Sequence, residues 1–429
     1  MSESPDPRPT HPPPRPARAA SSANFVLAAL FVLYIFNFVD RYILALLQDP
    51  IKGELGLTDT QLGLLSGPAF ALLYTTAGIP LARYADRGSR TLLISAGFVV
   101  WSAMTAACGL ARSYTQLLIA RVGVGVGEAS FTPTSHSLIA DYFPPATRAT
   151  AMAIFAAGAT AGTIVGNLLG GYLGDALGWR NTFLVVGLPG IAAAFVFQRC
   201  VHEPPRTLRA EAQQPFGRTL GYLLANRSYV FVVLSATLHS FSSYGAASWN
   251  ASFLRRVHEM SGSEVGLALA LNACVSVVGQ IGFGRLTDRL SRHDTRFAMW
   301  IPAITAVGAL PFLIGFTLWP SSLGALAFLM LGGLIVNAWT GPTYATAQSL
   351  VPPHMRAIAS AMLLFVMNVI GIGLGPLAVG ALNDFLVPRF GPEAIRYSLL
   401  IVVLPHTFAA IFNFLAARTL RQDLARVPA

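Results

Sequence analysis

The chain has 429 residues, of which 29 are Lys or Arg and 19 are Asp or Glu. Charged residues make up 11% of the sequence, against about 25% in soluble domains, and hydrophobic residues make up 54%. No single soluble core could bury that much apolar surface, so lipid must contact much of it. This composition excludes a soluble enzyme, a disordered chain and a nucleic-acid-binding protein.

Apolar runs of about 20 residues alternate with short polar breaks after a proline-rich start. Residues 1–23 contain seven prolines and three arginines and no apolar run, which predicts a disordered tail. The twelve spans that we expect are 25–47, 60–82, 92–111, 115–141, 149–174, 181–199, 228–254, 263–284, 297–318, 323–350, 357–386 and 395–417. They divide the chain into an N-terminal half (24–199), a polar linker (200–227), a C-terminal half (228–418) and a second tail (419–429).

The basic residues of the loops indicate the orientation. With the N-terminus inside, 20 of the 29 Lys and Arg residues fall in inside segments and 7 in outside segments. Cytoplasmic loops are enriched in Lys and Arg. We therefore expect a multi-pass protein with both termini in the cytoplasm, located in the inner membrane if the source is bacterial.

Motifs for metal, nucleotide or covalent chemistry do not occur in this sequence. Its three cysteines are far apart and form no C-x-x-C pair. H-E-x-x-H, G-x-x-x-x-G-K-[ST] and G-x-S-x-G are also missing. We expect no metal, no cofactor and no enzymatic activity.

The two predicted halves repeat the same landmarks. Ala82-Arg-Tyr-Ala-Asp-Arg-Gly-Ser-Arg90 matches Gly284-Arg-Leu-Thr-Asp-Arg-Leu-Ser-Arg292, at an offset of 202. Asp175 and the glycines before it match Asp384 and its glycines at an offset of 209. Two six-helix halves in the same orientation, with a substrate site between them near the midplane, form a transporter design. The predicted fold class is therefore an all-α integral membrane protein with two pseudo-symmetric six-helix halves.

Four ionisable residues lie inside predicted spans at positions from which lipid should exclude them: Asp40 and Arg41 in the first, and Arg121 and Glu128 in the fourth. A charge at mid-bilayer costs at least about 2.5–3.5 kcal/mol on insertion scales, and such residues usually mark function. Arg121 and Glu128 are two turns apart and share a helix face. Asp40 and Arg41 are about 100° apart, so we expect one at the contact of the first and fourth helices and the other in a cavity.

These four charges predict an anion site coupled to protons. The guanidinium groups of Arg41 and Arg121 match phosphate or carboxylate. Glu128 and Asp40 are the candidate proton carriers, because a substrate anion that binds the arginine would loosen the carboxylate's partner and promote its protonation. The alternative is uniport, with the carboxylates as permanent counter-ions.

The second half carries almost no charge within its spans and offers neutral lining instead. Together with Asn37 of the first half, the predicted cavity-lining residues are Tyr244, Trp249, Asn250, Asn337, Trp339 and Asn368. The predicted cavity therefore has a charged wall from the first half and a mostly apolar wall with a few polar groups from the second half. Such a cavity suits a substrate with an anionic or zwitterionic head and an apolar body.

The fifth predicted span carries a glycine ladder, Gly158, Gly162, Gly166 and Gly170. Such spacing lets helices approach closely. In the family named next, a glycine-rich fifth helix with Gly-Pro-x-x-Gly-Gly is associated with antiporters, but here Asn167 replaces the proline. The ladder therefore indicates either export or close helix packing.

The Asp-Arg-x-x-Arg loops after the second and eighth spans resemble the signature of the major facilitator superfamily, as does Arg121-x-x-x-Gly125. The glycine that is usual two residues after the Asp-Arg pair is replaced by Ser89 and Ser291. The resemblance implies alternating access and a cytoplasmic gate, in which Asp86 caps a neighbouring helix and pairs with arginine. The predicted gate residues are Arg83, Asp86, Arg87, Arg90, Asp288 and Arg289.

Two strings resemble the Spinster branch, which comprises lysophospholipid and sphingosine-1-phosphate transporters and their bacterial relatives. They are Asn37-Phe-Val-Asp-Arg41 and Gly127-Glu-Ala-Ser130, the latter followed by Ser137-Leu-Ile-Ala-Asp-Tyr-Phe143. The resemblance implies that Asp40, Arg41, Arg121 and Glu128 form the polar site. Organic-anion symporters of the same superfamily share the Asn-x-x-Asp-Arg string and the Glu-Ala pair.

The favoured function is a secondary active transporter of lysolipid-like or sphingolipid-like amphiphiles, coupled to protons and acting as a monomer. The alternative is a proton-coupled symporter of small organic anions or sugar acids. A receptor built on a transporter fold is disfavoured, because the predicted tails are too short for a signalling domain. Lipid, protons and the surrounding membrane are the expected partners, and nucleic acid is not.

Overall fold

A computed structural model describes residues 22–85, 87–204 and 216–427. This part of the chain is helical and contains no strand. The helices of the first half are α1 (Ala23–Leu55), α2 (Asp59–Ser66), α3 (Pro68–Ala85), α4 (Arg90–Leu110), α5 (Tyr114–Glu128), α6 (Phe131–Tyr142) and α7 (Pro145–Cys200). Those that follow are α8 (Phe216–Ala225), α9 (Arg227–His258), α10 (Gly262–Ser291), α11 (Phe297–Leu318), α12 (Ser322–Val336), α13 (Thr340–Ser349), α14 (Arg356–Met367), α15 (Gly375–Phe390) and α16 (Ala394–Ala425).

These helices give twelve passes. Eight continuous stretches of the described chain are long and apolar enough to cross a membrane. Two of them, Pro145–Cys200 and Pro353–Ala425, are too long for one crossing of a ~30 Å core at 1.5 Å per residue. Positive φ values at Gly178 (74°) and Gly391 (58°) divide each into two. The remaining two passes are α2 with α3 and α5 with α6, each interrupted by a short break.

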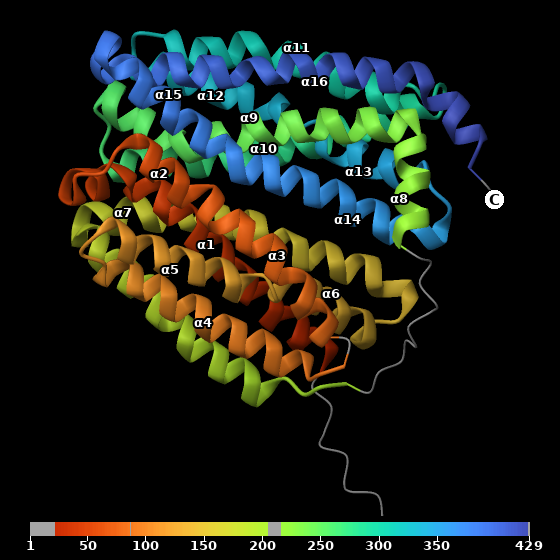
Figure 1. The fold of residues 1–429 in the computed structure, drawn as a ribbon, viewed down its shortest axis with the longest axis horizontal. Coiled ribbons are helices and arrows are strands. Elements are labelled where there is room, and N and C mark those ends of the chain that lie inside the picture. The colour runs from red at the N-terminus through yellow and green to blue at the C-terminus, as the bar shows by residue number, and fades with distance from the viewer. Residues whose placement is uncertain (1–21, 86, 205–215, 428–429) are drawn as a thin grey trace, which may run out of the picture.

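The two halves lie side by side, with α1 to α7 on one side and α8 to α16 on the other (Figure 1). The start of α1 and the end of α16 lie at the same end of the bundle, and the α1–α2 turn lies at the opposite end. We call the latter the distal end. The two ends of the chain lie at the same end of the bundle because the number of passes is even.

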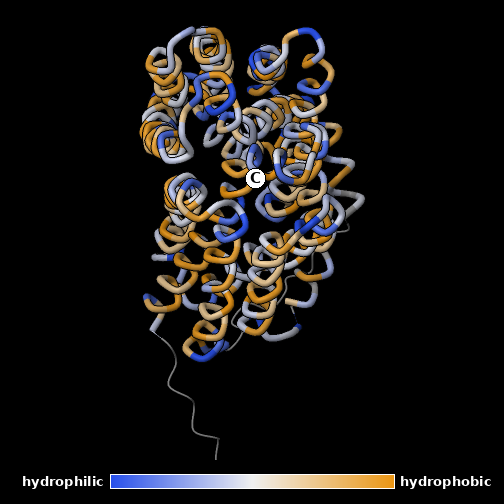
Figure 2. The backbone as a smooth tube through the Cα atoms, turned by 90° about the vertical axis from the view of Figure 1, so that its left-hand side faces the viewer, coloured by the Kyte–Doolittle hydropathy of each residue, from blue (hydrophilic) through white to orange (hydrophobic). Residues whose placement is uncertain are grey.

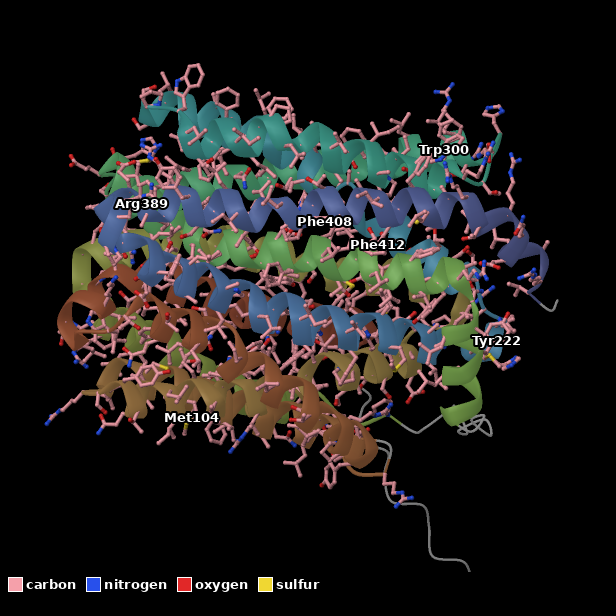
Figure 3. The ribbon with its side chains drawn as sticks, turned by 45° about the horizontal axis from the view of Figure 1, so that its top comes forward. Met104, Tyr222, Trp300, Arg389, Phe408 and Phe412 are labelled. Carbon is pink, nitrogen blue, oxygen red and sulfur yellow. The ribbon has the colours of Figure 1, made fainter. Side chains whose placement is uncertain are left out.

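The outer surface of the bundle is apolar. Phe385, Leu323 and Val278 are 79%, 78% and 67% exposed, and hydrophobic stretches recur along the helices in Figure 2. Phe408 and Phe412 lie along the middle of α16, whereas Arg389 and Trp300 lie at opposite ends of the bundle (Figure 3). A soluble protein rarely exposes so much contiguous apolar surface, so this face contacts lipid.

The glycine ladder of α7 allows close packing within the first half. Cβ atoms built at Gly158 and Gly162 would lie 3.0 Å from the carbonyl oxygen of Phe31 and 2.6 Å from that of Ile35, both on α1. Backbones that approach this closely tolerate no side chain. The ladder therefore has a packing role between α1 and α7, whatever the direction of transport.

Two parts of the predicted organisation differ from the structure. The linker 200–227 contains the helix α8, which buries Leu223 against the second half. The last helix continues to Ala425, beyond the predicted end of the span at 417, because its sequence remains compatible with a helix after it leaves the apolar region. Most of the proline-rich tail lies outside the described residues.

Candidate functional site

The four intramembrane charges meet between α1 and α5 as two crossed pairs. Arg41 of α1 pairs with Glu128 of α5, and Asp40 of α1 faces Arg121 of α5. Asp40, Arg121 and Glu128 are each at most 3% exposed. Each acid is thus opposed by the arginine of the other helix, which reduces the cost of holding four charges in the membrane interior.

The Arg41–Glu128 pair is tight. Nε of Arg41 donates to Oε1 of Glu128 at 2.6 Å, and a second guanidinium nitrogen contacts the same oxygen. The rings of Phe38, Phe70 and Tyr74 lie 5.2, 4.8 and 5.2 Å from the guanidinium carbon, which adds cation–π attraction. The guanidinium is therefore fixed, with one side still open to a cavity.

The Asp40–Arg121 pair is loose. Its shortest N–O distance is 3.9 Å, too long for a hydrogen bond. Asp40 instead accepts a hydrogen bond from the hydroxyl of Thr105 on α4. Nε and one terminal nitrogen of Arg121 are buried without a hydrogen-bond partner. Buried donors without partners are costly, so these two nitrogens have unused hydrogen-bonding capacity.

Two adjoining cavities lie between the halves. The smaller, about 70 Å³, is lined by Arg41, Arg121, aromatic side chains and Tyr244. The larger, about 290 Å³, extends into the second half among α9, α10, α11, α12 and α16. Tyr42, Ala45 and Ala247 line both. The two cavities therefore share part of a wall, and the arginines line only the smaller one.

The other predicted lining residues are divided between the cavities and the helix packing. Asn250 and Asn337 line the larger cavity. Trp249 is fully buried and donates to the carbonyl oxygen of Pro376 at 2.9 Å, and Trp339 stacks on His239. Asn37 is 2% exposed, and neither it nor Asn368, at the start of the π-helical turn Asn368–Leu374, is among the residues lining the two cavities.

Several residues of the site could not be recognised from the sequence. Thr105 is one of many small polar residues in apolar helices, and nothing distinguishes it until α4 is seen beside Asp40. Asn272 and His406 line the larger cavity. Asn272 is the exception, because an amide inside a predicted span of the second half is a candidate for neutral cavity lining from the sequence alone.

The model of the Major Facilitator Superfamily matches residues 30–376, most of the chain. The chain belongs to this superfamily. A bacterial homologue of the human lysosomal transporter Spinster, solved in an inward-facing and unoccupied conformation, superposes with a TM-score of 0.86. It is 32% identical over 94% of this chain and 98% of that one. These matches confirm the resemblance found in the sequence, and the chain is a secondary transporter.

Curated relatives within the superfamily differ in what they carry. An MFS-type efflux pump of Mycolicibacterium smegmatis is 33% identical over 95% of both chains. The sphingosine-1-phosphate transporter SPNS2 of Danio rerio is 27% identical over 84% of this chain and 76% of that one. The hexuronate transporter of Bacillus subtilis is 23% identical over 85% and 88%. The superfamily assignment therefore leaves the substrate class open.

At the distal end, a carboxylate of each half caps a helix of the other. Asp384 of α15 accepts from the backbone N–H groups of Asp59 and Thr60, at 3.0 and 2.7 Å, at the start of α2. Asp175 of α7 accepts from those of Gly262 and Ser263, at 3.1 and 2.7 Å, at the start of α10. The two contacts are equivalent under the internal repeat, and both hold the halves together.

An ion-pair cluster adds to this closure. Arg256 of α9 contacts Asp59 at 2.5 Å and Asp49 at 2.7 Å, and Lys52 contacts Asp59 at 2.6 Å. Arg255 pairs with Asp175 at 2.9 Å. Within the described residues, the hydrogen bonds and ion pairs between the halves all lie at this end. The distal end is therefore the closed end of the transporter.

The predicted gate residues lie at the opposite end. Asp288 and Arg289 are exposed at the end of α10, and neither forms an ion pair within the described chain. Arg87 is also exposed. Asp86 and the side chain of Arg83 lie outside the described residues. In the loop between α10 and α11, hydrogen bonds from the side chain and backbone of Arg296 lower the pKa of Asp294 to about 2.

Arg90 is a buried anchor rather than an exposed gate residue. It is 2% exposed, and it contacts Asp141 and lies 2.6 Å from Glu203. Its partners belong to its own half, so its ion pairs join α4 to α6 and to the chain after α7.

Arg90→Ala should destabilise the first half by about 3–5 kcal/mol, because it removes the buried guanidinium that pairs with Asp141 and Glu203. Thermal unfolding in detergent should show a clear fall in Tm. Arg87→Ala, three residues earlier and exposed, is the matched control and should leave the Tm unchanged. Equal Tm values for the two variants would contradict the anchoring role.

Proposed function

We propose that the protein transports an anionic amphiphile of the lysophospholipid or sphingolipid class by alternating access, coupled to protons. The observation that carries the proposal is the buried Arg121, which lines a cavity between the two halves and has two buried donor nitrogens without partners. That cavity adjoins a larger one with both apolar and neutral polar lining. Two adjoining cavities, one lined by arginines and the other amphipathic, match a substrate with an anionic head and an apolar body.

Arg121 supports head-group binding better than any other cation of the described site. Its contact with Asp40 is loose, so an anion gains charge-assisted hydrogen bonds without first breaking a tight pair. Arg41 lines the same small cavity and is already bonded to Glu128. We infer that the anion lies between the two guanidinium groups, with Arg121 as its anchor.

Glu128 is the proposed proton carrier. An anion beside Arg41 competes with Glu128 for that guanidinium and adds a negative charge nearby. Both effects favour protonation of the carboxylate. Substrate and proton would then bind together and leave together, which is the requirement for coupling.

We further propose that the distal end faces away from the cytoplasm and that the structure is inward-facing. The arginine-rich loops lie at the end that holds both termini, as the positive-inside rule requires. The contacts between the halves lie at the other end. The related Spinster homologue has been described in an inward-facing conformation.

Sugar acids are the second candidate substrates. A relative of similar coverage is a hexuronate transporter, and an anionic carboxylate fits the same arginines. The two substrate classes differ in the apolar body, which is absent from a sugar acid.

A flux assay in proteoliposomes tests the proposal. The panel contains a lysophosphatidate, a sphingoid-base phosphate and galactonate. The flux of each is measured with and without an inwardly directed proton gradient. We expect pH-driven movement of a lipid phosphate. Movement of galactonate alone would reject the lipid class, and lipid movement that is independent of the gradient would reject proton coupling.

A further inference from the structure

The larger cavity is neutral but rich in hydrogen-bonding groups. Among the described residues that line it there is no Asp, Glu, Lys or Arg. Amides and an imidazole are distributed among its aliphatic residues. They are Asn167, Asn250, Asn272, Gln280, Asn337 and His406.

A stripe of α9 connects this cavity to the arginine site. Ser243, Ala247 and Asn250 are spaced at about one turn and share one face of the helix. Ala247 lines both cavities. The hydroxyl oxygen of Ser243 and the amide oxygen of Asn250 are buried without hydrogen-bond partners. Two polar groups of this stripe are therefore unpaired.

Deeper polar groups of this cavity are unpaired as well. The amide oxygen of Asn272 has no partner, and it lies so close to α12 that a Cβ at Gly333 would approach it to 2.2 Å. His406 is 1% exposed, lines the cavity, and has no hydrogen-bond partner at either ring nitrogen. Its one ring neighbour, His239, lies edge-on at 4.9 Å.

We propose that the larger cavity is a second substrate subsite, which recognises neutral hydroxyl, ester or amide groups in the substrate's body through Asn250, Asn272 and His406. This inference rests on the proposed function for the position of the anionic head. A purely hydrocarbon body would leave these buried groups unpaired, whereas a body with donors and acceptors pairs them. The subsite therefore selects among anionic amphiphiles that share one head.

Two probes with the same head and chain test the subsite. Oleoyl lysophosphatidate carries a hydroxyl and an ester between phosphate and chain, and oleyl phosphate carries neither. Binding to the detergent-purified full chain is measured by displacement of radiolabelled lysophosphatidate. We expect the wild type to prefer lysophosphatidate at least tenfold.

The variant Asn250→Leu/Asn272→Leu should lose this preference and still bind oleyl phosphate, which shows that it is folded. Asn181→Leu, an exposed amide on α7, is the matched control and should keep the preference. Arg121→Leu should weaken both probes equally. A wild type that does not discriminate, or a preference that survives in the double variant, overturns the subsite.

Direct binding of radiolabelled galactonate separates failure of the subsite from failure of the proposed function. If only galactonate binds and the Asn250→Leu/Asn272→Leu variant weakens it, the subsite stands and the lipid substrate is rejected. If none of the three probes binds, both proposals are overturned.

Discussion

Glu128→Gln should reduce proton-driven flux by about 100-fold or more and leave substrate binding measurable. Gln keeps the shape of the side chain and an oxygen that can accept from Arg41, but it cannot carry a proton at physiological pH. A step that depends on one proton carrier loses typically 10²–10⁴-fold when the carrier is removed. Uptake driven by a pH gradient and equilibrium binding are measured on the same preparation.

Counterflow without a pH gradient is the internal control for this variant, because exchange of bound substrate needs no net proton movement. It should survive in Glu128→Gln. Glu259→Gln, at an exposed position after α9, is the control for carboxylate removal and should behave as wild type. Proton-driven flux that persists in Glu128→Gln would reject the proposed role and leave uniport, with Glu128 as a permanent counter-ion of Arg41.

The fold could be predicted from the sequence because lipid requires long apolar helices and because the landmarks repeat. The chain ends two of its spans with Asp175 and Asp384, at equivalent positions of the repeat. Their helix-capping contacts were not predictable. Each carboxylate binds backbone N–H groups of the opposite half, and backbone donors have no sequence signature.

The charged residues could be predicted for a different reason. Lipid excludes charge from spans, so Asp40, Arg41, Arg121 and Glu128 were conspicuous in the sequence. Their crossed pairing could not be read from it, because it depends on how α1 and α5 are rotated against each other.

The sequence did not predict which aromatic side chains line the cavities and which pack between helices. Trp249 and Trp339 were predicted to line the cavity, yet both are buried in helix packing, whereas Tyr244 lines the smaller cavity. A soluble helix shows its buried face by hydrophobic periodicity. In a membrane bundle, the lipid face and the packed face are both apolar, so composition does not fix the rotation of the helix.

The distal closure predicts a strong shift in conformation. Asp175 and Asp384 bind the first two N–H groups of α10 and α2, and each helix caps its own third position with Ser261 or Thr58. These carboxylates also face the positive ends of the helix dipoles. Hydrogen bonds to a charged group contribute about 1.5–3 kcal/mol each. They exist only when the distal end is closed.

Asp175→Asn/Asp384→Asn should therefore shift the equilibrium toward opening at the distal end. A neutral amide loses the charge and part of the acceptor capacity, and we expect a total loss of about 3 kcal/mol, or about 100-fold in the closed-to-open ratio. Spin labels at Leu177 and Arg389, in opposite halves near this end, report the change. The labels require Ser at the exposed Cys200 and Cys274.

Asp423→Asn is the matched control, because Asp423 also caps a helix start, that of α9, at 2.9 Å from the backbone nitrogen of Ser228. Both residues belong to the second half, so this variant should lose stability without widening the Leu177–Arg389 distance. The double variant should widen it and leave the packing within each half intact. If the distance distribution of the double variant matches that of wild type, the capping contacts do not hold the distal end closed, and the Arg256 cluster alone must do so.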